Sequence, residues 1–356
     1  MEYNCGGTVV RVDDVAEIAV AAGEAIMEIY KNEKDWDAKL KGDNTPLTAA
    51  DLAANKIICD SLTAKYPDIP IISEENKMAD YSTRKDYKYF FLVDPLDGTK
   101  EFIKRNGQFT VNIGLCDGNK PVLGVVRCPA LPIAETYSGV VGQGANMEDD
   151  ADRYPMSIRA KEFSEDDTGL KVVASLSHSN PETEAFIAKY KGAALTSMGS
   201  SLKLLLVAAG KAHVYPRLAP TSEWDTCAAH AVVLAAGGEV VQHPGGAPLA
   251  YNKPDILNPH FVVYGKRKAP APPPAAAAAA GKPAAATTSS GVNPGGLITD
   301  ENLPFIQLAL LALIGAIAYM YFSSAAGVLP EVAAEVIQEE AVEELYQQSV
   351  QEELGV

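Results

Sequence analysis

A long low-complexity segment, APAPPPAAAAAAGKPAAATTSSGVNPGG, interrupts this chain of 356 residues at Ala269. Prolines on both sides of the alanine run favour extended backbone, and the serines and glycines that follow are typical of a flexible linker. Such a composition does not build a packed core, so the residues before it have to do so. We therefore predict a globular domain over residues 1–268 and a linker over residues 269–303.

An apolar segment, PFIQLALLALIGAIAYMYF, follows the linker. It contains about eighteen apolar positions, interrupted only by Gln307, which is close to the length that a bilayer span requires. Aromatic residues gather at its end, as they do at membrane interfaces. We predict a single C-terminal transmembrane helix over residues 304–323. The alternative is a helix buried in the globular domain, which the long linker disfavours.

Residues 324–356 form an acidic tail in which valine and leucine recur at helical spacing with glutamates opposite. From Asp300 onward the chain has ten acidic residues and no lysine or arginine, so this end carries much of the formal net charge of −16. This charge excludes a nucleic-acid polymer as a partner, because phosphate backbones are bound by an excess of lysine and arginine. We predict an amphipathic helix that either binds a protein partner or stays in solvent.

The five cysteines, at positions 5, 59, 116, 128 and 227, show no C-x-x-C pair and no metal-ligand spacing. Scattered cysteines of this kind are typical of buried apolar positions in a reducing compartment. The helical pattern that starts by about Val15 leaves little room for a targeting peptide. We therefore expect the globular domain to lie in the cytosol or an organelle stroma, held at a membrane by its C-terminal end.

The stretch YFFLVDPLDGTKEF predicts a metal and phosphate site in the globular domain. Its first residues have the pattern of a strand buried on both faces, and Pro95 is expected to end the strand's pairing. Asp94 and Asp97 then flank a turn, and Gly98 with Thr99 offers backbone N–H groups to a phosphate. Two carboxylates beside a phosphate cradle repel each other unless cations lie between them, and Mg²⁺ suits carboxylate oxygens. The alternative is an aspartate-rich turn capped by its own side chains.

Acidic residues follow other predicted elements too. IPIISEE ends a short apolar strand at Glu74 and Glu75, TPLTAAD places Asp51 at the start of a helix, and PTSEWDTCAAHAVVLAAGG opens a helix at Asp225. Each carboxylate at a helix start is by itself most often a cap. Together they supply the acids that a two-metal phosphoryl-transfer site needs.

At these residues the chain resembles the Mg²⁺-dependent, lithium-sensitive phosphomonoesterase superfamily that includes inositol monophosphatase and fructose-1,6-bisphosphatase. Three motifs in order carry the resemblance, namely SEE after one strand, DPLDGT after the next and WDT near the C-terminal end of the domain, and it covers residues 10–265. The resemblance implies a mixed α/β fold, a layered αβαβα sandwich of the sugar-phosphatase type. One departure is Ala229, where the family usually has glycine, and its extra methyl group removes no ligand.

Within this superfamily the chain is most similar to the CysQ-type 3′(2′),5′-bisphosphate nucleotidases. Lys100 and Glu101 stand where inositol phosphatases usually carry Thr-Asn, and SSLKLLLVAAGKAHVYPR is similar to the segment that contacts the nucleotide in this branch. The resemblance implies hydrolysis of the 3′-phosphate of adenosine 3′,5′-bisphosphate to AMP and phosphate by a metal-activated water. Two alternatives are an inositol or sugar monophosphatase with the same metal site, and a membrane-tethered scaffold with an incidental enzyme fold.

The family's roles, carried onto the matching positions, imply a site for two or three Mg²⁺ ions. Its ligands would be Glu74, Asp94, the carbonyl of Leu96, Asp97 and Asp225. Thr99 and Glu74 would orient the attacking water and help to deprotonate it. Asp51 would hold a water on a further, weaker metal.

The same resemblance implies contacts with a small nucleotide. The backbone amides of Gly98 and Thr99 would hold the transferred phosphoryl group, next to Asp225. The residues for the other phosphate and the ribose would be His178, Ser200, Lys203 and Arg217.

Several of these polar residues also have a simpler explanation. Ser200 and Ser201 could cap the helix that follows, Lys203 could be solvated on its polar face, and His178 could cap a loop. His230, five residues after the aspartate of its helix and so about 140° around it, is expected to point away from the metals.

Overall fold

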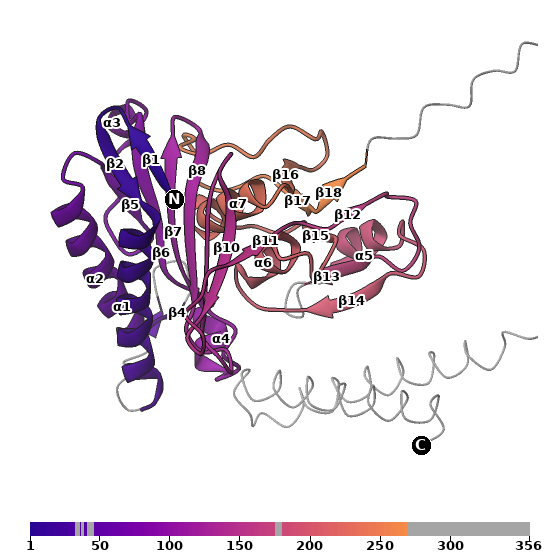
Figure 1. Cartoon of the computed structure of the whole chain (residues 1–356), viewed down its shortest axis with the longest axis horizontal. Coiled ribbons are helices and arrows are strands. Elements are labelled where there is room, and N and C mark those ends of the chain that lie inside the picture. The colour runs from indigo at the N-terminus through magenta and orange to yellow at the C-terminus, as the bar shows by residue number, and fades with distance from the viewer. Residues whose placement is uncertain (33–35, 37–38, 41–45, 175–179, 269–356) are drawn as a thin grey trace, which may run out of the picture. The chain divides into compact units, whose positions relative to one another are not determined.

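The computed structural model describes residues 1–32, 36, 39–40, 46–174 and 180–268. The predicted linker, transmembrane helix and acidic tail lie outside these residues, as does His178. Among the residues that are described, no helix is both long and apolar enough to cross a membrane. Helices and sheets of the globular domain form alternating layers in the predicted order (Figure 1).

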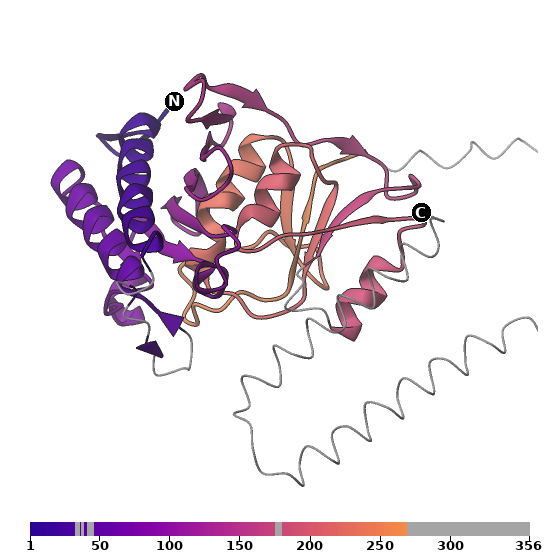
Figure 2. The same ribbon diagram turned by 90° about the horizontal axis from the view of Figure 1, so that it is seen from below.

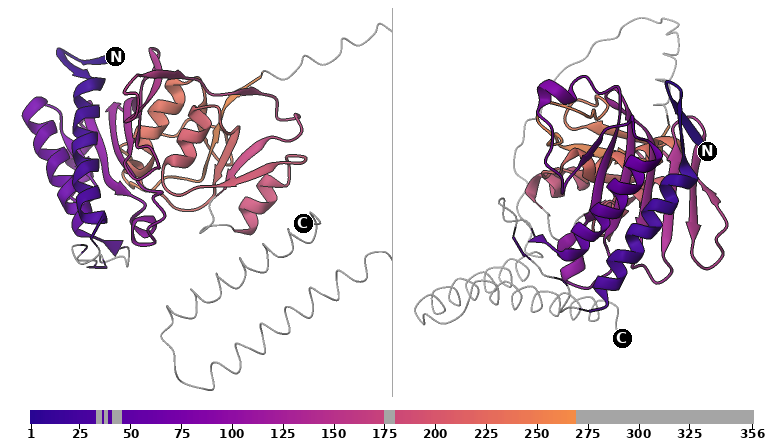
Figure 3. Two further views of the ribbon diagram at one scale, coloured as in Figure 1. Left: turned by 60° about the horizontal axis from the view of Figure 1, so that its bottom comes forward. Right: turned by 90° about the vertical axis from the view of Figure 1, so that its left-hand side faces the viewer.

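The first layer is a pair of helices, α1 (Val12–Tyr30) and α2 (Ala49–Lys65), which lie together on one face of a large sheet (Figure 3). The buried residues of α1, such as Val15, Ile18 and Ala22, repeat at helical spacing and face the sheet's core. A strand pair, β1 (Glu2–Cys5) and β2 (Thr8–Arg11), precedes α1.

The large sheet has seven strands in the order β11-β10-β9-β8-β7-β6-β5. Most neighbours are antiparallel, but β5 and β6 run parallel, so residues that follow β5 lie beside the end of β6. The strands are β5 (Ile71–Ser73), β6 (Tyr89–Asp97), β7 (Thr110–Asp117), β8 (Lys120–Cys128), β9 (Glu135–Val140), β10 (Gly144–Asp149) and β11 (Met156–Ile158).

Strand β6 is buried on both faces, as its apolar run predicts. Phe90 and Leu92 belong to one core cluster and Phe91 to the other. The prediction that pairing ends at Pro95 is wrong, because β6 continues to Asp97. The ladder is interrupted between Asp94 and Asp97, and this irregularity takes the proline, which has no N–H to donate, out of the ladder.

Helices α6 (Leu202–Ala208) and α7 (Glu223–Ala235) form the third layer, between the two sheets (Figure 2). The smaller sheet has the order β14-β13-β15-β17-β16. Its strands are β13 (Lys171–Ala174), β14 (Ala194–Ser197), β15 (Val214–Arg217), β16 (Glu239–Gln242) and β17 (Phe261–Tyr264). In β17, Phe261 packs with the α6–α7 layer, whereas Val262 packs with Phe186 of α5 (Pro181–Ile187), which covers the outer face. The short elements are β3 (Lys39–Leu40), β4 (Pro46–Leu47), α3 (Tyr81–Arg84), α4 (Thr99–Ile103), β12 (Glu162–Phe163) and β18 (Lys266–Arg267).

A row of glycines lets α7 lie directly on the large sheet. Gly114, Gly124 and Gly139 are partners across β7, β8 and β9. A Cβ atom at Gly124 would lie 2.0 Å from the carbonyl oxygen of Ala228, and one at Gly114 would lie 2.6 Å from the Sγ atom of Cys227. The depth at which α7 packs is therefore set by the absence of side chains beneath it.

Candidate active site

Three of the predicted acidic residues converge on one point. The carboxylate oxygens of Glu74, Asp94 and Asp225 lie within 4.8 Å of one another. Glu74 follows β5, and its N–H donates to the carbonyl of Val93 at 3.1 Å, which places it beside β6. Asp225 reaches the same point from the first turn of α7. Segments far apart in the sequence thus form one carboxylate cluster.

The carboxylate cluster brings acidic groups together around one buried member, Asp94, with Glu74 and Asp225 partly exposed. Burial raises the pKa of Asp94 well above its usual value, and the neighbouring Glu74 and Asp97 raise it further. Burial and Asp97 also raise the pKa of Asp225 to about 8. Buried carboxylates stay ionised only when a cation compensates them. Because hard oxygen donors at this spacing suit a divalent cation, these residues fit the predicted metal centre.

Asp97 lies next to this cluster, at the end of β6. Its Oδ2 atom accepts a hydrogen bond of 2.5 Å from the backbone N–H of Ser201. Burial raises the pKa of Asp97 to about 6, while the ammonium group of Lys203 and the Ser201 N–H act in the opposite direction. The carbonyl of Leu96, the other predicted ligand in this turn, accepts a hydrogen bond from the Thr99 hydroxyl at 3.4 Å. Of these contacts, the short hydrogen bond from the Ser201 N–H fixes the direction of the Asp97 carboxylate.

Asp51 has a different set of contacts. It is the third residue of α2, which begins two residues before the predicted start, and its Oδ2 atom accepts from the backbone N–H and the hydroxyl of Thr48 at 2.7 and 2.6 Å. Its Oδ1 atom accepts from the Thr99 hydroxyl at 3.2 Å. Asp51 thus orients Thr99 and caps its own helix. Its role on a further metal stays a prediction.

Two turns approach each other closely at Gly98 and Ser200. Gly98 is left-handed, with φ of 95°, and a Cβ atom there would lie 3.2 Å from the Cβ atom of Ser200. Ser200 itself has φ of 43°, which is uncommon for a residue with a side chain. Ser201 is the N-cap residue of α6, but its hydroxyl donates to Asn112 instead of capping the helix. The capping explanation is therefore wrong for Ser201.

Two cations accompany the acids. Lys203 is 5% exposed, so the explanation that it is solvated is wrong. Its Nζ atom donates to the carbonyl of Met198 at 3.1 Å and lies 5.7 Å from the ring centre of Tyr215. Burial lowers the pKa of Lys203 to about 8, and the charge of Asp97 partly restores it. Arg217 lies close enough to the acids to lower the pKa of Asp225, and its buried Nε atom has no hydrogen-bond partner among the described residues.

Comparison with known proteins identifies the family at this point. The model of the inositol monophosphatase family matches residues 9–276. The chain belongs to the inositol monophosphatase family. It is 44% identical over 253 residues to the 3′(2′),5′-bisphosphate nucleotidase CysQ of Escherichia coli strain K12, which covers 71% of this chain and 98% of that protein. It is 35% identical over 256 residues to the CysQ of Haemophilus influenzae, covering 71% of this chain and 92% of the relative.

Solved structures agree with this membership. The crystal structure of CysQ from Bacteroides thetaiotaomicron, described as a bacterial member of the inositol monophosphatase family, is 40% identical and has a TM-score of 0.62, covering 74% of this chain and 100% of that chain. The inositol monophosphatase from Anabaena is 23% identical with a TM-score of 0.54, covering 72% of this chain and 89% of that chain. The second likeness shows a shared fold.

Sequence reasoning missed part of the polar lining of this family site. Ser201 contacts Thr110 and Asn112 of β7, two residues to which the motifs assign no role. A signal was present, because Thr110 and Asn112 are polar residues at alternate positions of a strand that is then apolar or small until its last residue, Asp117. Alternate positions point to one face, which here is the face that carries the site.

His230 lies in the core, as its position on the helix predicts. Its Nδ1 atom is 2.7 Å from the hydroxyl of Tyr251, which in turn donates to Thr226 at 3.2 Å. Burial lowers the pKa of His230 to about 3, so the ring is neutral near pH 7. It supports the packing of α7 and takes no part in the carboxylate cluster.

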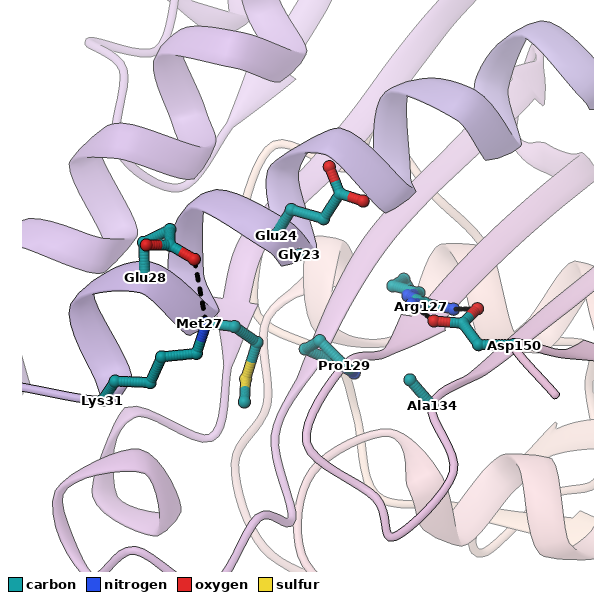
Figure 4. A pocket seen from close by; sticks show the side chains of 9 residues that line it. All are labelled: Gly23, Glu24, Met27, Glu28, Lys31, Arg127, Pro129, Ala134 and Asp150. Atoms are coloured by element: carbon teal, nitrogen blue, oxygen red, sulfur yellow. Dashed lines mark hydrogen bonds and ion pairs between the residues drawn. The ribbon is translucent and has the colours of Figure 1, made fainter.

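A separate hollow of about 180 Å³ lies between α1 and the end of β8 (Figure 4). Two ion pairs border it, Arg127 with Asp150 at 2.6 Å and Lys31 with Glu28 at 2.9 Å. These charged groups already neutralise one another, and no residue of the carboxylate cluster lines the hollow.

Proposed function

We propose that the chain hydrolyses the 3′-phosphate of adenosine 3′,5′-bisphosphate to AMP and phosphate. Identity of 44% to E. coli CysQ over nearly all of that protein supports this activity. One feature of the site carries the proposal, namely the pair of partly or fully buried cations, Lys203 and Arg217, beside the carboxylate cluster. A monophosphate ester brings one phosphate to the metals, whereas a bisphosphate brings a second, and these cations match its charge.

The attacking water is oriented by Thr99 and Glu74 in this proposal. The single proton of the Thr99 hydroxyl lies between Oδ1 of Asp51 at 3.2 Å and the carbonyl of Leu96 at 3.4 Å, so the hydroxyl oxygen would accept a hydrogen bond from water. Glu74 would take the proton that the water gives up, and its membership of the carboxylate cluster supports this role.

Mg²⁺ is the cofactor that we propose, as two or three ions. The ligands would be Glu74, Asp94, the carbonyl of Leu96, Asp97 and Asp225. When bound, the ions would supply Lewis acidity and neutralise the charge of the transferred phosphoryl group. The backbone amides of Gly98 and Thr99 would hold its oxygens, and Ser200 together with His178 would contact the rest of the nucleotide.

Phosphate release by the full-length chain tests this function. The substrates are adenosine 3′,5′-bisphosphate, adenosine 3′-monophosphate and myo-inositol 1-phosphate, each with Mg²⁺ and with lithium as a probe. We expect the bisphosphate to be preferred, and Lys203→Met to reduce the preference over the 3′-monophosphate by roughly 10–150-fold, because a charged contact contributes roughly 1.5–3 kcal/mol.

Asp97→Asn is the control for the metal site and should abolish release from all three substrates. A preference for the inositol ester would retain the mechanism and contradict the proposed substrate. No release from any of them, with metal still bound, would favour a scaffold with an incidental enzyme fold.

We propose in addition that residues 304–323 anchor the enzyme in a membrane, with the catalytic domain in a reducing compartment. The apolar length of this segment supports the anchor, and the five free cysteines of the domain support the compartment. Fractionation tests the anchor: the protein should resist extraction by salt and be released by detergent. Release by salt alone would contradict it.

The acidic tail, residues 324–356, is proposed to bind a protein partner. Apolar residues at helical spacing within a strongly acidic segment support this proposal. The test is a pull-down with the tail against one in which its valines are replaced by serine. Recovery of the same proteins by both would contradict a specific partner.

A further inference from the structure

A buried chain of hydroxyl groups connects α6 to β7 beside the site. The Ser201 hydroxyl donates to Oδ1 of Asn112 at 2.8 Å and lies 2.8 Å from the hydroxyl of Thr110. Either hydroxyl of the Thr110–Ser201 pair can be the donor, and the Thr110 hydroxyl also lies 3.5 Å from the hydroxyl of Ser200. Thr110 and Asn112 are 0% exposed and Ser201 is 2% exposed, so water does not replace these contacts.

The two β7 residues of this hydrogen-bond network, Thr110 and Asn112, pair with β6, the strand that carries predicted metal ligands. In the ladder between β6 and β7, Thr110 is the partner of Asp97 and Asn112 is the partner of Asp94. The ladder is interrupted between these two positions. A single hydroxyl, that of Ser201, therefore links the two ladder positions on either side of the irregularity.

Ser201 also acts on Asp97 through its backbone. Its N–H donates to Oδ2 of Asp97 at 2.5 Å, and the direction of this N–H depends on the backbone of Ser200, whose φ is 43°. A left-handed conformation at a residue with a side chain persists only where its surroundings hold it. Here the Gly199 N–H is bound by the side chain of Gln108 at 2.6 Å on one side, and the Ser201 hydroxyl is bound by β7 on the other.

We propose that Thr110, Ser201 and Asn112 form a positioning clamp, which holds the Ser201 N–H where it aligns Asp97 for a divalent cation. The inference rests on the proposed metal-dependent function. None of the three residues touches the reacting phosphate in this scheme. They act through Asp97, as groups behind a metal ligand commonly do, and such groups typically contribute about 10–100-fold to metal affinity or activity.

The test is metal binding by the full-length chain, measured by titration calorimetry with Mg²⁺ and with Mn²⁺ in the absence of substrate. Thr110→Val removes the hydroxyl at nearly constant volume, and Ser201→Ala removes the central member of the clamp. We expect each to raise the dissociation constant of the metal by about tenfold. Thr110→Ser keeps the hydroxyl and should stay within about twofold of the parent chain.

Thr136→Val is the matched control. Its hydroxyl is also buried and accepts a hydrogen bond from Arg127 at 3.1 Å, but it lies on β9, two strands from β7. Its loss should leave the dissociation constant unchanged. The double variant Thr110→Val with Ser201→Ala should bind metal no more weakly than Ser201→Ala alone, because the two residues belong to one network.

Thermal unfolding of each variant shows that the chain is folded before binding is compared. Equal metal affinity in Thr110→Val, Ser201→Ala and Thr136→Val would overturn the clamp, and so would a change confined to the KM for the nucleotide. Since metal binding is measured without substrate, these results do not depend on which phosphate ester is hydrolysed. Failure to hydrolyse the bisphosphate would contradict the proposed function and leave the clamp standing.

Discussion

Helices α2 and α7 begin with the same local motif, a capping box whose third helical residue is an aspartate. In α2 the pair is Thr48 with Asp51, and in α7 it is Ser222 with Asp225. In both helices the aspartate accepts a hydrogen bond from the backbone N–H of the N-cap residue, at 2.7 Å in α2 and 2.8 Å in α7. The two acids thus share a sequence pattern, a place in the helix and one contact.

The two aspartates differ in the groups that their carboxylates face beyond the N-cap residue. The second oxygen of Asp51 faces the hydroxyl of Thr99, a hydrogen-bond donor. Asp225 faces Glu74 and Asp94, which are acceptors like itself. Burial raises its pKa, and the charges of Asp97 and Glu74 raise it further. An acid that meets a donor becomes an orienting group, whereas an acid that meets other acids needs a cation. The local motif decides where a carboxylate is placed, and the rest of the fold decides its role.

Replacing Asp225 by asparagine gives the largest expected effect. The asparagine keeps an oxygen for the Ser222 N–H and loses the charge that the cluster uses for a cation. We expect metal affinity and phosphate release to fall by more than the ~100-fold that supporting residues can contribute. Because the raised pKa of Asp225 means that its ionised form is unfavourable in the folded metal-free chain, the variant without metal should unfold at a higher temperature. Calorimetry and thermal unfolding measure the two effects, and retained metal affinity would contradict the role of Asp225.

Replacing Asp51 by asparagine should have a smaller and different effect. The amide side chain offers one acceptor oxygen where the carboxylate of Asp51 serves both Thr48 and Thr99. We expect phosphate release to fall by about 10–100-fold, as for loss of a group that orients another functional residue, while metal affinity stays within about threefold of the parent value. If metal affinity fell as far as in Asp225→Asn, Asp51 would be a ligand and the contrast between the helices would fail.

The pH dependence of stability should also separate the two helices. In the metal-free protein the folded-state pKa values of Asp97 and Asp225 are raised to about 6 and about 8. The folded state then binds more protons than the unfolded state, so stability is highest below about pH 4 for these groups and falls as pH rises through 6 and 8. Asp14 and Asp150, whose pKa values are lowered by Lys65 and Arg127, act in the opposite direction, at lower pH.

We therefore expect the unfolding temperature of the metal-free chain to fall by several degrees between pH 5 and 8.5. Mg²⁺ should flatten this slope, and Asp225→Asn should reduce it more than Asp51→Asn does. A series of unfolding curves in buffers with a chelator measures the slope. A flat profile without metal would mean that the carboxylate cluster is compensated by protein groups alone.

The smallest expected effect comes from the cap of α2. Thr48→Ala removes the hydroxyl that donates to Asp51 at 2.6 Å but keeps the backbone N–H. We expect a loss of about 1 kcal/mol in the free energy of unfolding, which is typical of an N-cap hydroxyl. Metal affinity should not change. Chemical denaturation measures the loss, and a change in metal affinity would show that the cap and the cluster are coupled.

Much of the site was predictable because its acids lie at the ends of apolar strands or at the starts of helices. The pattern YFFLV indicated a strand buried on both faces, and residues after such a strand lie at a sheet edge. The three motifs of the family resemblance then predicted that Glu74, Asp94 and Asp225 belong to one site. The predicted starts of the two helices, at Asp51 and Asp225, each lie two residues after the observed start. Thr48 and Ser222, three positions before these aspartates, gave a capping-box signal that marks the true starts.

Contacts between distant segments were not predictable in the same way. The burial of Lys203 and the hydroxyl chain through Ser201 depend on how α6 meets β7, and single side chains give no information on that register. The strand's passage beyond Pro95 is a further case, because a ladder irregularity accommodates the proline and no local rule demands one.

The row of Gly114, Gly124 and Gly139 makes the enzyme vulnerable at positions that carry no chemical group. A methyl group at Gly124 would meet a backbone carbonyl at 2.0 Å, and a backbone cannot turn aside as a flexible side chain can. Helix α7 would have to lift, and it would carry Asp225 away from partners that stay on the sheet. Such a variant would keep Glu74, Asp94 and Asp225 in its sequence but would no longer hold their carboxylate oxygens within 4.8 Å of one another. Inherited loss of activity in this chain can thus arise where an inventory of functional residues would find nothing missing.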